Sequence, residues 1–167
     1  MCDRTTDKDS CIDEILHKYA DMVYRIALTN TKQRFDAEDI FQDVFLALFQ
    51  SEVRFESDDH IRYWLIRVTV NFCKKHHRSV WQKKTVSLDS VEKLSELMTE
   101  QEFAVFDAVC KLPAKYRTVI QLFYFEDMTV DEISSVLHRK NTTVKSQLSR
   151  ARSKLRDMLK GDYFYEP

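Results

Sequence analysis

The sequence predicts an all-α protein made of two small helical domains joined by a flexible linker. The chain of 167 residues contains one glycine, Gly161, and two prolines, Pro113 and Pro167. Tight hairpin turns need residues that tolerate positive φ, and glycine adopts such angles at the least cost. Hydrophobic residues make up 44% of the chain and charged residues 32%, as in globular rather than disordered proteins. Apolar residues at helical spacing then define the individual helices.

Residues 1–78 are expected to form the first domain, with three helices. The first helix spans residues 12–30. Asp36 is expected to cap a second helix that ends near Gln50, and after a polar loop a third helix runs over residues 60–78. The positions predicted to face the core are Ile15, Leu16, Tyr19, Met22, Val23, Ile26 and Ala27, then Ile40, Phe41, Val44, Ala47 and Leu48, then Ile61, Trp64, Leu65, Val68 and Phe72.

The chain loses its sustained apolar face over residues 79–100, which are predicted to be a linker with at most one helical turn. The second domain is expected to cover residues 101–167. Its predicted helices span 101–112, 114–127, 129–137 and 142–160.

The last two of these helices form a predicted helix-turn-helix. Thr129 and Glu132 have the spacing of a capping box, and His138 to Asn141 form the turn. The predicted buried stripe of the last helix consists of Val144, Leu148, Ala151 and Leu155. The opposite face carries Ser146, Ser149, Arg150 and Ser153, and it is flanked by Lys145, Arg152 and Lys154. Small hydroxyl side chains between long basic ones are typical of a helix that enters the major groove of DNA. An ordinary amphipathic surface helix is the alternative.

Two helices of the first domain carry outward faces of interest. Asp39, Gln42, Asp43 and Leu46 share the side of the second helix opposite the core, which suggests a docking surface for a basic partner helix. On the third helix, Tyr63, Arg67, Asn71 and Lys74 point outward and are suited to hold an unstacked base. A solvated face and a half-buried packing tyrosine are the respective alternatives.

The charge distribution favours a nucleic-acid partner although the net charge is −1. Residues 62–84 contain seven Lys or Arg and no acid, and residues 139–160 contain eight bases and one acid. Both stretches therefore carry +7, and the rest of the chain carries −15. Two basic patches on an acidic body suit two separate contacts with a polyanion.

Other classes of protein find little support in the sequence. No apolar stretch is long enough to cross a membrane, no secretory signal is seen, and the scattered cysteines indicate reduced thiols in the cytoplasm. Phosphate-binding loops, nucleophile elbows and HExxH motifs are missing, so no enzyme, cofactor or small-molecule substrate is expected. Cys73, His76 and His77 have a spacing that suits a metal, but Lys74, Lys75 and Arg78 would repel a cation.

From about residue 12 to residue 160 the chain resembles the bacterial extracytoplasmic-function (ECF) sigma factors. DAEDIFQDVFLALF is similar to sigma region 2.2, RFESDDHIRYWLIRVTVNFCKKHHR to regions 2.3 and 2.4, and LPAKYRTVIQLFYFEDMTVDEISSVL with TTVKSQLSRARSKLR to region 4. The resemblance implies a promoter-specificity subunit that binds core RNA polymerase, through its β′ coiled coil and β flap, and also promoter DNA. It further implies an anti-sigma factor as a partner.

The resemblance also implies which residues make each contact. Those implied for core polymerase are Asp39, Gln42, Asp43 and Leu46. Those implied for the −10 promoter element are a base-capturing loop around Phe55 to His60, with Ser57 and Asp58, and Tyr63, Trp64, Arg67, Asn71, Lys74 and Lys75. Those implied for the −35 element are Thr142, Thr143, Lys145, Ser146, Gln147, Ser149, Arg150 and Arg152.

The chain departs from the family pattern at its turns. Thr142 replaces the usual glycine that opens the recognition helix, and Lys140 replaces a proline. Asp127 stands where a turn glycine is common, and Ser57 replaces a glycine in the loop before the third helix. The competing hypothesis is a stand-alone helix-turn-helix regulator, which would explain the second domain but not the basic third helix or the Asp39–Leu46 stripe.

Overall fold

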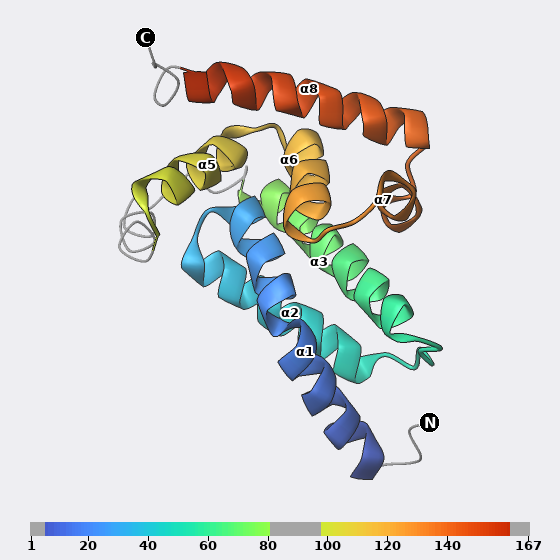
Figure 1. Ribbon diagram of the computed structural model, residues 1–167. Helices are drawn as coiled ribbons and strands as arrows, with labels where there is room; N and C mark the ends of the chain where they lie inside the picture. Colours follow the sequence, from blue (N-terminus) through green and yellow to red (C-terminus); the bar gives the residue numbers. More distant parts are fainter. Residues whose placement is uncertain (1–5, 81–97, 161–167) are drawn as a thin grey trace. The chain divides into compact units, whose positions relative to one another are not determined.

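The computed structural model describes residues 6–80 and 98–160, which form helices joined by short turns and loops (Figure 1). The chain divides into two compact units, Met1–Gln82 and Lys83–Pro167. No strand occurs in either described range. The predicted fold class, an all-α protein with two helical domains, is confirmed.

The first unit is a bundle of three helices, α1 (Thr6–Thr31), α2 (Arg34–Gln50) and α3 (Asp58–Val80), and each helix packs against the other two. Its interior is closely packed with aliphatic side chains, which include Val23, Ile26, Ala27, Ala37, Val44, Leu65 and Ile66. The positions of α1 and α2 that were predicted to face the core are buried, except for the half-buried Leu16, Phe41 and Ala47.

The start of α2 differs from the prediction. The helix begins at Arg34, after Gln33, whose side chain makes no capping bond. Asp36 therefore lies in the first helical turn, where its Oδ2 is 3.2 Å from Nε2 of His76 in α3. The capping prediction for Asp36 is wrong because the chain already turns at Lys32, whose φ is 61°, so the helix starts before the aspartate is reached.

The buried face of α3 also differs from the prediction. Leu65 is buried as expected, but the other four predicted positions, Ile61, Trp64, Val68 and Phe72, are only half-buried. The remaining buried positions are Ile66, Thr69, Val70 and Cys73. Thr69 tolerates the core because its hydroxyl donates to the Leu65 carbonyl at 2.6 Å, which satisfies the polar group within the helix itself.

The second unit contains α5 (Glu100–Lys111), α6 (Ala114–Ile120), a π-helical turn η1 (Gln121–Phe125), α7 (Val130–Leu137) and α8 (Asn141–Lys160). The long helix α8 lies across α5, α6 and α7 and packs against each of them (Figure 1). Its core includes Leu112, Val119, Ile120, Leu122, Ile133, Val144, Leu148 and Ala151. Leu155, the last member of the predicted stripe of α8, is half-buried.

Capping boxes begin α7 and α5. In the predicted box of α7, Thr129 Oγ1 accepts from the Glu132 N–H at 3.2 Å and Glu132 Oε2 accepts from the Thr129 N–H at 2.7 Å. Thr99 and Glu102 form a second box, not predicted from the sequence, with bonds of 3.2 and 2.9 Å. Backbone and hydroxyl hydrogen bonds from Thr99 lower the pKa of the Glu102 carboxyl. The linker predicted over residues 79–100, with at most one helical turn, lies mostly outside the described ranges.

The helix expected over residues 114–127 is not continuous. After α6 the chain widens into η1, where the Glu126 N–H donates to the Gln121 carbonyl at 3.2 Å. Asp127 then adopts a φ of 51°, and His138 adopts a φ of 52° at the end of α7. These left-handed residues stop the helices in a segment without glycine.

A buried arginine joins α5 to α6. Arg117 is 4% exposed, and its Nη1 donates to the carbonyls of Cys110 at 3.0 Å and Leu112 at 3.3 Å. These carbonyls lie at the C-terminal end of α5, where a helix leaves acceptors without intrahelical partners. Arg117 therefore closes α5 from inside the unit.

Candidate protein and nucleic-acid interfaces

The predicted stripe on α2 is fully on the surface. Asp39, Gln42, Asp43 and Leu46 are all exposed, and Leu46 keeps 53% of its accessible area. The four residues recur at the spacing of one helix face. The structure therefore brings together two carboxylates, an amide and an apolar side chain on one accessible surface.

Two phenylalanines extend this surface and were missed in the sequence. Phe35 is 76% exposed and Phe49 is 50% exposed. Phe35, Gln42, Leu46 and Phe49 stand at i, i+7, i+11 and i+14, so they line one side of α2. We call Phe35, Asp39, Gln42, Asp43, Leu46 and Phe49 the α2 stripe. Large apolar groups gathered on an exposed face mark an interaction surface more strongly than a single leucine does.

Aromatic rings gather where the loop after α2 meets α3. The edge of the Phe55 ring meets His60 at 5.3 Å and Trp64 at 5.7 Å between ring centroids. The Glu56 N–H donates to His60 Nδ1 at 3.3 Å, and the His60 N–H donates to Ser57 Oγ at 3.1 Å. Ser57 thus caps α3 in place of the family's glycine, and the predicted loop is an ordered aromatic cluster.

Asp58 takes a different part from its neighbours in this loop. Its Oδ2 lies 2.6 Å from Nζ of Lys18, and its carbonyl accepts from the Tyr19 hydroxyl at 3.2 Å. The hydrogen bond to Asp58 raises the pKa of Lys18. Asp58 therefore links the start of α3 to α1.

An accessible face of α3 continues from the cluster. His60, Trp64, Arg67, Asn71 and Lys75 follow one another at spacings of three or four residues, and so lie along one side of the helix. The first three are half-buried, whereas Asn71 and Lys75 are exposed. Of the other predicted residues, Lys74 is exposed and Tyr63 is half-buried. A half-buried indole beside a guanidinium and an amide is suited to stacking against an unpaired base.

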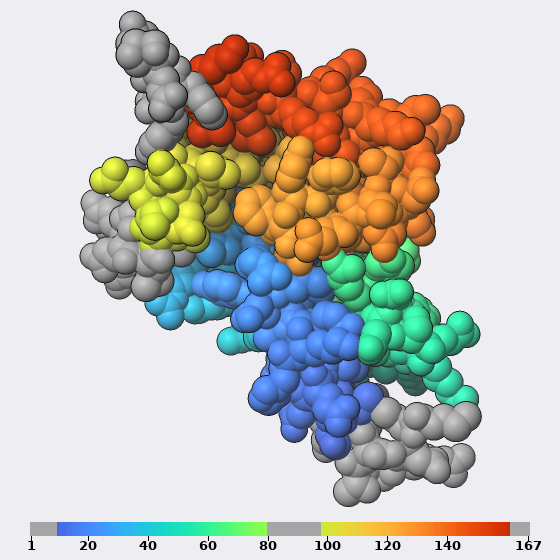
Figure 2. Space-filling view, in the orientation of Figure 1, coloured from blue at the N-terminus to red at the C-terminus, as the bar shows by residue number. Residues whose placement is uncertain are grey.

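The outer face of α8 is the third surface. α8 lies on the outside of the second unit (Figure 2). The predicted residues that are exposed are Thr142, Thr143, Lys145, Ser146, Ser149, Arg150 and Arg152. Gln147 is half-buried, and its Oε1 accepts from Arg139 Nη1 at 2.9 Å. This hydrogen bond ties Gln147 to the turn between α7 and α8. Burial lowers the pKa of Arg139.

Two arginines of α8 meet tyrosines from the helices beneath. Arg152 Nε donates to the Tyr124 hydroxyl at 2.7 Å. A hydrogen bond from Arg150 lowers the pKa of Tyr116. Asn141 is the first residue of α8, and its side chain donates to the Asp131 carboxylate in α7. The side chains of α8 are therefore not all free to turn toward a ligand.

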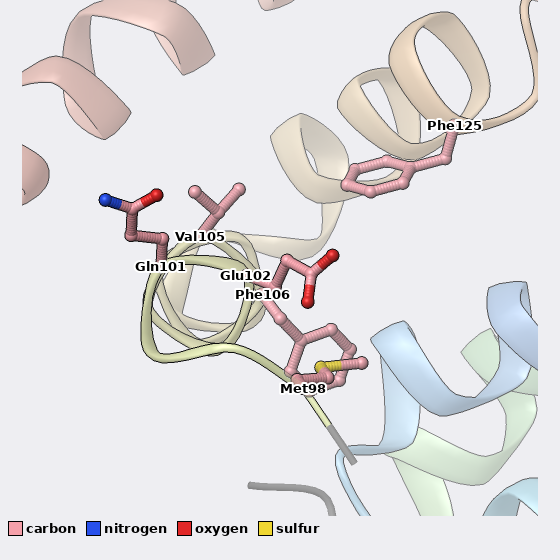
Figure 3. A pocket seen from close by; sticks show the side chains of 6 residues that line it. All are labelled: Met98, Gln101, Glu102, Val105, Phe106 and Phe125. Atoms are coloured by element: carbon pink, nitrogen blue, oxygen red, sulfur yellow. The ribbon is translucent and has the colours of Figure 1, made fainter.

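An apolar pocket of about 530 Å³ lies between α5 and η1. Its lining consists of Met98, Gln101, Glu102, Val105, Phe106 and Phe125. Figure 3 shows the Phe125 ring projecting from η1 toward the α5 side chains. Val105 is 41% exposed and Phe125 is 45% exposed, so the pocket opens on apolar surface.

The metal site that spacing alone permits is not formed. Within residues 6–80 and 98–160, no group of three His, Cys, Asp or Glu side chains is placed to hold a metal ion. Cys73 is buried in the core and His76 contacts Asp36. None of the helices in these ranges is both long and apolar enough to cross a bilayer.

Comparison with protein families matches both units. Residues 15–83 match the family described as Sigma-70 region 2, and residues 102–155 match the family described as Sigma-70, region 4. The RNA polymerase sigma factor SigV of Bacillus subtilis is 30% identical over 144 residues, which cover 81% of this chain and 83% of SigV. The ECF RNA polymerase sigma factor SigM of the same organism is 28% identical over 158 residues, which cover 87% of this chain and 93% of SigM.

Solved structures show the same fold at lower identity. The sigma factor RpoE from Bartonella quintana, solved in complex with the anti-sigma factor NepR, superposes with a TM-score of 0.71 at 19% identity, over 90% of this chain and 97% of RpoE. CnrH, solved in complex with the cytosolic domain of CnrY, superposes with a TM-score of 0.70 at 23% identity, over 92% of this chain and 90% of CnrH.

Proposed function

This chain belongs to the ECF sigma factors of bacterial RNA polymerase, and we propose how its exposed surfaces divide the work of promoter recognition. The chain is a promoter-specificity subunit that acts with core polymerase rather than an enzyme in its own right. Its place of action is then wherever RNA polymerase transcribes, in the cytoplasm.

The α2 stripe is the proposed docking surface for core polymerase, on the β′ coiled coil. Asp39 and Asp43 supply negative charge that attracts a basic partner helix and speeds association. Phe35, Leu46 and Phe49 supply apolar area that is lost from water on binding. This combination, on a helix whose opposite side fills the core of the first unit, is the observation that carries the proposal.

The aromatic cluster and the accessible face of α3 are the proposed reader of the −10 element. A base that leaves the duplex loses stacking, and Phe55, His60 and Trp64 offer rings that replace it. Arg67, Lys74 and Lys75 offer positive charge along the path of the strand. Binding free energy from these contacts offsets the unstacking of a few base pairs.

The outer face of α8 is the proposed reader of the −35 element. Thr142, Thr143, Ser146 and Ser149 are short enough to let the helix approach base edges, and Lys145 reaches a phosphate at the margin of the groove. The apolar pocket between α5 and η1 is the proposed contact for the β flap. An anti-sigma factor would silence the chain by covering these surfaces, as a proposed partner.

Transcription of fragmented host DNA by core polymerase, with and without the chain, tests the function. New discrete transcript starts that share two upstream sequence motifs are expected. The stand-alone regulator is not favoured, because it gives the exposed apolar side of α2 no task. Tight duplex binding by the chain alone, together with no new starts, would support that regulator and refute the proposal.

A further inference from the structure

We propose that Arg152 is a positioning residue that holds α8 against η1, and that it is not one of the arginines that contact DNA. The inference rests on the proposed −35 role of α8. Arg152 lies two turns after Lys145 on the same flank of α8, and this position by itself suggests a phosphate contact. Its guanidinium, however, contacts residues of η1.

Arg152 is occupied on two sides. Its Nε donates to the Tyr124 hydroxyl at 2.7 Å. Its guanidinium carbon also lies 5.4 Å from the Phe123 ring centroid and 5.6 Å from the Tyr124 ring centroid. A cation within about 6 Å of an aromatic face is attracted by the ring quadrupole. The guanidinium is therefore drawn toward η1 and away from the exposed side of α8.

The shape of this site suits arginine in particular. The rings of Phe123 and Tyr124 meet edge to face, with centroids 5.0 Å apart and planes at 72°. A planar guanidinium stacks on one ring while its N–H groups keep a fixed direction toward the hydroxyl, whereas a lysine ammonium is a compact point charge. Loss of either the planar fork or the phenol oxygen would thus release the contact.

The π turn explains why the tyrosine is available. The hydrogen bond that closes η1 joins residues five apart, so its ring encloses one more residue than in an α-helix, which changes the direction in which later side chains project. Tyr124 remains 52% exposed and does not serve the core. Turns of this kind are frequent at functional sites, and here the rings of Phe123 and Tyr124 in η1 both contact Arg152 of α8.

The effect on DNA reading comes through the rotation of α8 about its axis. Arg152 fastens one flank of α8 to the Tyr124 hydroxyl. The exposed hydroxyl residues Ser146 and Ser149 lie on the outer face beside this flank. A helix that turned would carry these short side chains away from the base edges.

Salt dependence separates a positioning residue from a phosphate contact. The affinity of the holoenzyme for a promoter should be measured over a range of salt concentrations, and log K plotted against log salt. Each lost phosphate contact reduces the magnitude of the slope by about 0.9. Arg152→Ala is expected to leave the slope unchanged while it lowers affinity about three- to tenfold, and only when the −35 element is intact. Lys145→Ala, on the same flank, is the matched control and is expected to reduce the slope by about 0.9.

Two further variants sharpen the test. Arg152→Lys keeps the charge and Tyr124→Phe keeps the ring, yet both are expected to behave like Arg152→Ala, with no added loss when Tyr124→Phe and Arg152→Ala are combined. A reduced slope for Arg152→Ala together with normal affinity for Arg152→Lys would overturn the proposal and leave the −35 role of α8 standing. An affinity of the wild-type holoenzyme that stays the same when the −35 sequence is altered would overturn that role itself. Thermal unfolding of each variant confirms that the second unit stays folded.

Discussion

Replacement of Phe35 by alanine is the most direct test of the α2 stripe. The ring is 76% exposed in the free chain, so its apolar area is available to a partner and contributes little to folding. Full burial of a phenylalanine side chain is worth about 1.5 to 3 kcal/mol. Three quarters of that range predicts a loss of about 1 to 2 kcal/mol, which raises the Kd for core polymerase about five- to thirtyfold.

The kinetics of association should separate the two kinds of residue in the stripe. Phe35→Ala removes an apolar anchor and is expected to raise the dissociation rate. Asp39→Asn removes a charge at the rim and is expected to lower the association rate, with an effect that shrinks as salt rises. Surface-immobilised core polymerase and a series of chain concentrations give both rates.

The control for these variants is Glu14→Ala, which removes an exposed charge from α1. Its affinity for core polymerase should equal that of the wild type. Thermal unfolding should place Phe35→Ala at or slightly above the wild type, because alanine is the better helix former at an exposed position. A Kd for Phe35→Ala within twofold of the wild type, in a folded variant, would refute the assignment of this side of α2 to polymerase.

Three other predictions concern the second unit. His138→Gly should stabilise it by up to about 1 kcal/mol, because φ is 52° at this position and glycine adopts that angle without strain; urea denaturation measures the gain, and a loss would show that the histidine side chain matters more than its backbone. Thr99→Ala should lower the unfolding temperature, and the unfolding temperature of this variant should decrease less in acid than that of the wild type. Hydrogen bonds from Thr99 lower the pKa of Glu102 in the folded chain, so the stability they add is complete above the unfolded pKa and disappears as the pH falls through the folded one; an unchanged acid profile would contradict this. Arg117→Met should destabilise the unit by about 3 kcal/mol or more, because the carbonyls of Cys110 and Leu112 lose their buried donor, and a variant as stable as the wild type in calorimetry would disprove that role.

The helices themselves were within reach of sequence reasoning because apolar spacing and capping chemistry are local. The box at Thr129 and Glu132 and the core faces of α1 and α2 illustrate this. The face of α3 was misjudged for a physical reason. Its buried side includes Thr69, whose hydroxyl a hydropathy pattern does not count as core, together with Ile66, Val70 and Cys73, so the apolar face lies to one side of the predicted one. Trp64 is large enough to reach the core and the surface together.

The candidate interfaces were predicted less completely. The charged members of the α2 stripe stand out in the sequence, but Phe35 and Phe49 look like core residues until it is known which side of α2 faces the core. A second row of apolar residues on α2, Phe35, Leu46 and Phe49 at i, i+11 and i+14, is the signal that could have revealed them. The pairing of Arg152 with Tyr124 spans 28 residues and depends on a π turn, for which the sequence carries no local marker.

The three helix ends formed by Lys32, Asp127 and His138 have a consequence for the unfolded chain. Glycine would adopt these angles more easily, but it would also give the unfolded chain more conformations to lose on folding. With Gly161 as its only glycine, the chain accepts local backbone strain at a few helix ends in exchange for a smaller entropy change along its whole length. Each of these three residues is therefore a point at which a single substitution can shift the balance between the two states without replacing a residue of the α2 stripe, the α3 face or the outer face of α8.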